Sequence, residues 1–218
     1  MSITEVEVSE RLARVRARIA AAGGDQSVSV LAVTKTFGLD AVEAAIAAGC
    51  PAVGENYAQE VATKFADLQP LPPVYFIGQL QTNKVRLLVP YVAVYASVDR
   101  ASLVDEIAKR APGARVLVQV DTASETGKGG CPVAEVPALV ERCRAAGLIV
   151  DGLMTVGPTD GGPEQARPGF REVRSLVDRL GLSVCSMGMS DDLEVAVAEG
   201  ATQVRIGSAL FGTRPPRD

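Results

Sequence analysis

The sequence predicts an α/β protein built as a TIM (β/α)8 barrel, with an extra helix at the N-terminus. One observation behind this prediction is a set of eight short apolar runs along the chain. Another is that segments with helical spacing of apolar residues separate these runs, and most of the segments end at Gly or Pro. Near-continuous apolar strands alternating with amphipathic helices are typical of parallel β-structure that helices cover.

The predicted elements follow one another in a regular order. The apolar face of the first helix is formed by Val8, Leu12, Val15 and Ile19. Ser2 and Glu5 are spaced for a capping box at its start, and Gly23-Gly24 ends it. The eight predicted strands span residues 28–34, 52–54, 74–78, 92–97, 115–120, 148–154, 182–186 and 203–206. Helical segments are expected around residues 42–46, 61–68, 88–89, 103–107, 136–143, 170–180 and 193–197, and the last helix is expected to be short.

The chain length fits a single domain. At 218 residues it is slightly short for a TIM barrel, and no composition shift divides it, so we expect one domain over residues 1–218. A doubly wound sheet is the alternative fold. That fold usually has a glycine-rich phosphate turn after its first strand, where this chain reads Lys35-Thr36-Phe37-Gly38.

Composition narrows the possible partners and chemistry. The net charge of −4 gives no reason to expect nucleic acid or a membrane as partner, and the four arginines between Arg11 and Arg18 are expected on a solvated helix face. The apolar runs are too short to span a membrane, and the chain starts without the features of a signal peptide, so we expect a cytoplasmic protein.

Cysteine and histidine usage narrows the chemistry further. The four cysteines are scattered, which indicates reduced thiols and no zinc site. The chain has no histidine, which excludes mechanisms and metal sites that need one.

Lys35 is the most informative residue, because a charged amine at the tip of an apolar strand is costly unless it faces a site. Its distant counterparts are Ser186–Ser190 and Arg205–Ser208, which follow the last two strands with small, donor-rich residues. In a TIM barrel phosphate often binds there. Gly188 and Gly207 would allow close approach of an anion, and Ser190 is expected to cap the next helix. An amine opposite an anion cradle indicates a phosphorylated carbonyl ligand held as a Schiff base, commonly pyridoxal phosphate.

Other residues complete the candidate site. Arg205 is placed to reach the ring nitrogen of a bound pyridine, and Asn56 to donate to the cofactor or to a lysine partner. Met187, like Met154, is a candidate ring contact or a core residue. The rivals of Lys35 are Lys84, near a helix start, and Lys128, in a glycine-rich loop, whereas Lys64 and Lys109 lie on predicted helices and are poor candidates.

Six motifs occur in order along almost the whole chain. They are Ala32-Val33-Thr34-Lys35-Thr36, Gly54-Glu55-Asn56, Phe76–Lys84, Gly152-Leu153-Met154, Ser186–Ser190 and Val204–Gly212. As a set they resemble the pyridoxal phosphate homeostasis proteins (the YggS/PROSC family) and, more distantly, the barrel domain of alanine racemase. Two positions depart from the family pattern: Tyr75 stands where histidine is usual, and Asp121 where asparagine is usual.

The resemblance implies a fold-type III barrel with pyridoxal phosphate on Lys35. It also implies phosphate contacts from Ser190, Gly207 and Ser208, and Arg205 beside the pyridine nitrogen. It further implies a role in vitamin B6 and amino-acid homeostasis, with apo pyridoxal enzymes as recipients of the cofactor. We expect no catalytic residues and no metal site, and we expect the protein to be a monomer. Two alternatives stay open at this point. One is an amino-acid racemase or another pyridoxal phosphate-dependent enzyme, and the other is a phosphate-binding barrel that uses Lys35 without pyridoxal.

Overall fold

The computed structural model describes residues 2–123, 125 and 129–213. The strands are β1 (Ser29–Val33), β2 (Ala52–Glu55), β3 (Val74–Phe76), β4 (Val92–Val98), β5 (Arg115–Asp121), β6 (Cys131–Pro132), β7 (Ile149–Thr155), β8 (Val184–Ser186) and β9 (Gln203–Ile206). The longer helices are α1 (Glu5–Ala21), α2 (Leu39–Ala47), α3 (Ala58–Lys64), α5 (Ala101–Arg110), α6 (Val136–Ala145), α7 (Arg167–Arg179) and α8 (Leu193–Ala198). Shorter helical turns are η1 (Thr82–Lys84), α4 (Val85–Leu88), η2 (Val133–Glu135), η3 (Pro163–Ala166) and α9 (Ser208–Phe211).

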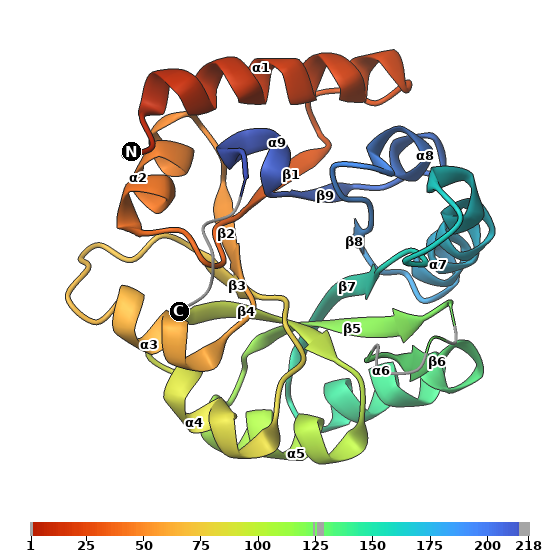
Figure 1. Ribbon diagram of the computed structural model, residues 1–218. Helices are drawn as coiled ribbons and strands as arrows, with labels where there is room; N and C mark the ends of the chain where they lie inside the picture. The colour runs from red at the N-terminus through yellow and green to blue at the C-terminus, as the bar shows by residue number, and fades with distance from the viewer. Residues whose placement is uncertain (1, 124, 126–128, 214–218) are drawn as a thin grey trace.

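The strands close into a parallel barrel, as the sequence predicts. Their order is β4-β3-β2-β1-β9-β8-β7-β5, and pairing of β4 with β5 completes the ring. Closure at the chain ends comes from β1 against β9, where Leu31 is the register partner of Arg205. The short β6 pairs with the end of β5 outside the ring and is not among the predicted strands. Figure 1 shows the helices surrounding the ring of strands.

The barrel has a core on each side of its strands. The larger core lies between strands and helices and includes the buried Val30, Val53, Phe170 and Ile206. A smaller cluster of Val94, Ala96, Leu117 and Met154, joined by the partly buried Tyr75, fills the interior. Register explains this division, because Tyr75 is paired with Val94 and side chains of paired parallel residues point to the same face.

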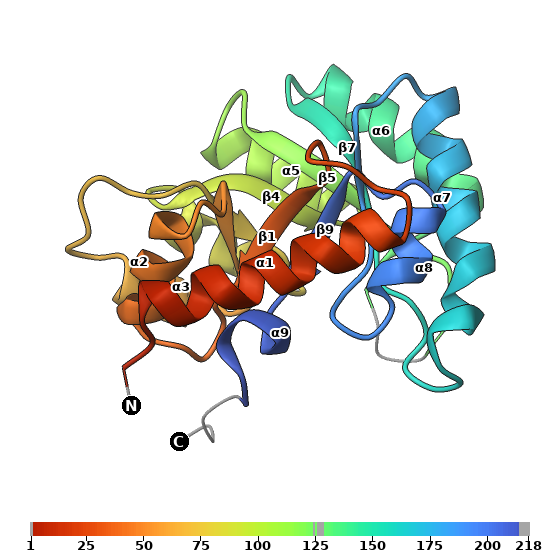
Figure 2. The same cartoon turned by 90° about the horizontal axis from the view of Figure 1, so that it is seen from above.

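The N-terminal helix packs outside the ring. Helix α1 contacts α2, α8 and α9, and Figure 2 shows it lying lengthwise across them. Its buried face is the predicted one. The predicted capping box of Ser2 and Glu5 is wrong, since Thr4 is the N-cap and Glu7 completes the box. The Ser2 hydroxyl instead donates to Asp40 at 3.2 Å, so the chain before the helix is tied to α2.

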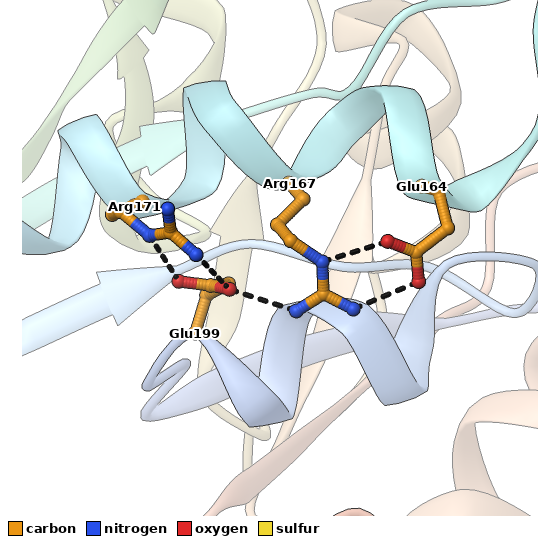
Figure 3. A network of polar contacts seen from close by, with 4 residues as sticks. All are labelled: Glu164, Arg167, Arg171 and Glu199. Carbon is orange, nitrogen blue, oxygen red and sulfur yellow. Dashed lines mark hydrogen bonds and ion pairs between the residues drawn. The ribbon is translucent and has the colours of Figure 1, made fainter.

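An ion-pair network joins α7 to the end of α8 (Figure 3). Glu199, which follows α8, accepts from Arg167 at 2.7 Å and from two nitrogens of Arg171 at 3.0 Å. Arg167 also donates to Glu164 at 2.7 and 2.8 Å. These bonds lower the pKa of Glu199, chiefly through Arg171 and then Arg167, and the bond to Arg167 lowers the pKa of Glu164.

The described part of the chain lacks two features that would point to other classes of protein. No helix within it is long and apolar enough to cross a membrane. It also holds no group of three or more Cys, Asp or Glu side chains arranged to bind a metal ion.

The network around Glu199 should stabilise the fold at neutral pH and lose this effect at low pH. Its pKa lies below the ordinary 4.5, so its contribution is fully present above that value and is lost as the pH falls through the lower folded-state pKa. We expect Glu199→Gln to have a lower thermal midpoint than the wild type at pH 7, measured by circular dichroism. At pH 3 the difference in thermal midpoint between the two proteins should be smaller. Glu172→Gln on the exposed side of α7 is the control. A deficit that stays constant between pH 7 and pH 3 would contradict the assignment.

Candidate functional site

The carboxyl ends of four neighbouring strands form the candidate site. Lys35 follows β1, Asn56 follows β2 and Ser190 lies beyond β8. Arg205 is the next-to-last residue of β9, and Gly207 and Ser208 follow that strand. The strands adjoin in the order β2-β1-β9-β8. Segments that are far apart in the sequence are therefore gathered on one arc of the barrel opening, which is the face where TIM barrels place their sites.

Lys35 occupies the turn after β1, two residues beyond Val33, and it is half-buried. Val33 is the register partner of Gly54, so the turn stands beside the end of β2. Lys84 lies in η1, as expected, and Lys109 near the end of α5. Lys128 lies outside the described residues. Among the described lysines, Lys35 is thus the one in the turn that directly follows a strand of the ring.

The far end of the chain contributes a pair of serine hydroxyls beyond β8 and β9. The Oγ atoms of Ser190 and Ser208 lie 3.2 Å apart. Ser208 begins α9, whose first N–H groups have no carbonyl partner within the helix. Gly188 has φ +90°, and a Cβ there would lie 2.5 Å from the Cβ of Ala196, so the loop requires glycine. These hydroxyl and backbone donors are of the kind that binds phosphate oxygens.

The expectation that Ser190 caps the next helix is wrong. Asp192 is the N-cap residue of α8, and its Oδ1 accepts from the N–H of Met189 at 2.6 Å. This bond closes the loop on itself and leaves the hydroxyl of Ser190 directed to Ser208.

Helix α1 supports the serine pair from behind. Arg18 donates to the carbonyl oxygen of Ser190 at 2.8 Å and forms two bonds to Glu194. Arg11 donates to the carbonyl oxygen of Leu210 at 3.0 Å, and Arg16 donates to the carbonyl oxygen of Val28. The expected solvated arginine face is therefore wrong for three of the four arginines, which bind backbone carbonyls of other elements. Spacing along a helix cannot reveal such partners, because they come from distant parts of the chain.

Arg205 is a buried cation in the wall of the barrel, with only 4% of its surface exposed. Its guanidinium donates to the carbonyl oxygen of Ser186 at 2.7 Å, to the hydroxyl of Ser186 at 3.1 Å and to the carbonyl oxygen of Thr155 at 2.6 Å. Burial lowers the pKa of Arg205 to about 10, so it stays charged at neutral pH. Neutral acceptors on the ends of two adjacent strands, β7 and β8, thus hold the guanidinium, and the described residues form no ion pair with it.

Asn56 lies beside a small cavity at the opening. The cavity has a volume of about 130 Å³, and its lining includes Asn56, Gln79, Gln119 and Asp121. The Oδ1 atom of Asn56 is buried without a hydrogen-bond partner among the described residues. Gly78 packs closely here, since a Cβ would lie 2.1 Å from the carbonyl oxygen of Asn56. An orphaned acceptor next to open space is suited to a polar ligand atom.

The two methionines are divided between the two cores. Met154 belongs to the interior cluster, below the opening. Met187 is fully buried in the outer core, where its Sδ lies 3.6 Å from Cys185 Sγ. The structure therefore does not bring the Met187 side chain to the other predicted site residues. A contact from this position to a ligand would have to come from its backbone.

The two positions that depart from the family pattern have different surroundings. Tyr75 lies inside the barrel near Gln203, and burial raises the pKa of its hydroxyl. Asp121 ends β5 at the opening and accepts from the N–H of Ala123 at 3.1 Å. Only Asp121 is thus close to the cavity beside Asn56.

Lys64 is a site-adjacent residue that the sequence does not single out. It lies on α3, as predicted, but its amine is buried among the carbonyl oxygen of Thr34 and the carboxylates of Glu55 and Glu60. The spacing of Glu60 and Lys64 is a signal for an ion pair. The burial of that pair against the end of β2 depends on tertiary packing.

Comparison with known proteins identifies the family of this chain. The family model described as "Alanine racemase, N-terminal domain" matches residues 7–215. A pyridoxal phosphate homeostasis protein of Pseudomonas aeruginosa is 40% identical, and the match covers 98% of this chain and 97% of that protein.

Solved structures of related proteins have the same fold. PipY of Synechococcus elongatus superposes with a TM-score of 0.85 without PLP, at 32% identity, and 0.80 with PLP bound, at 30% identity. Each match covers 94% of this chain and all of PipY. Alanine racemase of Clostridium difficile, 13% identical with a TM-score of 0.76, shares the fold over 59% of its own length and 99% of this chain. The chain therefore belongs to the family of pyridoxal phosphate homeostasis proteins, whose barrel is the alanine racemase N-terminal domain.

Proposed function

We propose that this protein binds pyridoxal phosphate as a Schiff base on Lys35 and serves vitamin B6 and amino-acid homeostasis without efficient catalytic turnover. The observation that supports the proposal is the arc of strand ends β2-β1-β9-β8, which carries Lys35, the hydroxyl pair of Ser190 and Ser208, and the buried Arg205. The match to family members named for pyridoxal phosphate homeostasis supports it.

The residues present fit the chemical groups of the cofactor. Ser190, Gly207 and Ser208 would hold the phosphate, because two hydroxyls and the first N–H groups of α9 converge there. Arg205 would face the pyridine nitrogen, and Asn56 would offer its amide to the ring substituents. Lys35 would supply the amine for a Schiff base with the aldehyde of the cofactor, a condensation that releases water and needs no oxidant or reductant.

Arg205 favours a carrier over a catalyst. Pyridoxal phosphate supplies an electron sink when its ring nitrogen is protonated. A guanidinium with a pKa of about 10 keeps its own protons at neutral pH and would leave that nitrogen unprotonated. The cofactor would be held, but it would stabilise a carbanion poorly.

We further propose that the protein acts as a monomer in the cytoplasm and passes the cofactor to apo pyridoxal enzymes. All four cysteines are buried free thiols, which is compatible with a reducing compartment. The structure of PipY with PLP bound shows that a relative of similar length accepts this cofactor on the same fold.

Lys35→Ala should abolish covalent attachment of the cofactor and leave the fold intact. Lys35 is half-buried in a turn, so its loss removes no core packing. Visible absorption, and intact mass after borohydride reduction, would both lose the signal of bound pyridoxal phosphate. Lys84→Ala is the control and should label as the wild type does. Mapping of the label to Lys84 or Lys128 in the wild-type protein would contradict the assignment.

Removing the serine hydroxyls should weaken cofactor binding more than folding. Each charge-assisted hydrogen bond to phosphate contributes about 1.5–3 kcal/mol, so Ser190→Ala and Ser208→Ala should each reduce affinity about ten- to a hundredfold. A bulky residue at Gly207 should have a similar effect, because it is buried at the start of α9. Titration with pyridoxal phosphate measures the loss, with Ser102→Ala on the exposed side of α5 as control. Unchanged affinity in the double serine variant would exclude this cradle.

The loaded protein should not racemise alanine efficiently. Racemisation needs a base on each face of the α-carbon, and Lys35 provides one. Among the tyrosines, Tyr95 is buried with its pKa raised to about 12, Tyr75 lies within the barrel interior, Tyr91 packs against the larger core, and Tyr57 is the half-buried residue before α3. L-alanine in heavy water, followed by chiral analysis and mass spectrometry, tests this. Rapid formation of deuterated D-alanine, absent in Lys35→Ala, would favour the enzyme alternative instead.

A further inference from the structure

A buried charged cluster stands directly behind the turn that carries Lys35. The Nζ atom of Lys64 lies 2.7 Å from Glu55 Oε1, 2.7 Å from Glu60 Oε1 and 2.9 Å from the carbonyl oxygen of Thr34. The side chains of Lys64 and Glu55 are 7% and 0% exposed. The cluster therefore joins the ends of β1 and β2 to helix α3 through one ammonium group.

The cluster binds the residues on both sides of Lys35. Before it, the hydroxyl of Thr34 donates to Glu55 Oε1 at 2.7 Å, and its carbonyl oxygen accepts from Lys64. After it, the backbone N–H of Thr36 donates to Glu60 Oε1 at 2.7 Å. Thus both residues next to Lys35 form hydrogen bonds with the same charged cluster.

Thr36 has an unfavourable backbone conformation. Its φ is +68°, and among the residues that the structure describes it is the one non-glycine residue with a positive φ. A β-branched residue avoids this region, because its Cβ crowds the neighbouring carbonyl. The Thr36 hydroxyl is buried without a partner among the described residues, so its side chain does not compensate. Its backbone N–H donates to Glu60 Oε1, and this hydrogen bond anchors the conformation.

Stability alone is a weak explanation for such a cluster. Desolvation of a buried ion pair offsets much of its attraction, and apolar replacements of similar volume are often at least as stable. Burial raises the pKa of Glu55 even though Lys64 and Thr34 oppose the shift, and its Oε2 has no partner among the described residues. The cluster is costly to bury, and its hydrogen bonds go to the two residues that flank Lys35. This arrangement indicates a role in positioning Lys35.

We propose that Lys64, Glu55 and Glu60 are positioning residues that hold the Thr34–Thr36 turn in the conformation presenting the amine of Lys35 to the cofactor carbonyl. This inference rests on the proposed function. It concerns the covalent link alone, because the cluster lies at the ends of β1 and β2, whereas the serine pair lies beyond β8 and β9.

Glu60 is the best residue for a test, because its side chain is 24% exposed and its loss leaves the Lys64–Glu55 pair intact. Glu60→Ala removes the acceptor of the Thr36 N–H, whereas Glu60→Gln keeps an oxygen in the same place. Glu43→Ala, which removes an exposed carboxylate from α2, is the matched control. Two ligands distinguish the covalent link from the phosphate contacts. Affinity for pyridoxal phosphate depends on both Lys35 and the serine pair. Affinity for 4-deoxypyridoxine phosphate, which lacks the aldehyde, depends on the serine pair alone.

We expect Glu60→Ala to reduce affinity for pyridoxal phosphate about tenfold or more, and to slow borohydride-trapped labelling of Lys35, with unchanged affinity for the deoxy analogue. Glu60→Gln and Glu43→Ala should behave as the wild type. In a Lys35→Ala background, Glu60→Ala should have no further effect on pyridoxal phosphate affinity, because the interaction being positioned is already absent.

Three results would overturn this inference: equal loss of both ligands, no loss of either, or an undiminished effect of Glu60→Ala in the Lys35→Ala background. Failure of the proposed function has a different signature. In that case the wild-type protein itself would bind neither ligand or would bind both equally without labelling.

Discussion

Pairing of β1 with β9 is the interaction on which the rest of the site depends. It brings residues 29–32 against residues 203–206, so the first and last strands of the ring become neighbours. Without this closure, the lysine after β1 and the serines beyond β8 and β9 would lie at opposite edges of an open sheet. Because all ring strands are parallel, closure also puts their carboxyl ends on one face. Helix α1 reinforces the closure by binding carbonyl oxygens of Ser190 and Leu210.

The polar groups near the opening follow two different electrostatic arrangements. Lys64 has two carboxylates within 2.7 Å, so its charge is compensated inside the protein. Arg205 is held by carbonyl and hydroxyl oxygens, and Asp192 contributes only a more distant favourable charge. A compensated cluster suits a structural task, whereas a charge bound by neutral acceptors retains attraction for a ligand. This difference separates the group that would face the ring from the groups that would hold the lysine turn.

Much of the fold could be predicted, because its signals are local in the sequence. These signals are the spacing of apolar residues and the glycines and prolines that end the helices. All eight ring strands lie within one or two residues of the predicted ranges, whereas β6, two residues long, has no periodicity to detect. The positions of Lys35, Ser190, Arg205 and Ser208 at strand ends also follow from local pattern. The capping residues Thr4 and Asp192, the arginine contacts of α1 and the burial of Lys64 do not, since each depends on which element packs against which.

The same barrel can support a carrier or an enzyme, and the difference lies in what surrounds the lysine. Alanine racemase of Clostridium difficile shares this fold over only 59% of its chain, so much of that enzyme lies outside the common barrel. Here Lys35 follows β1, the buried Arg205 lies in β9, and Tyr75 and Tyr95 lie within the barrel interior or its core. An amine held in one orientation beside a fixed cation would favour reversible attachment of an aldehyde over proton transfer at a substrate carbon. The unfavourable conformation of Thr36 would serve that attachment, because the turn would fix the direction of the amine before a ligand arrives.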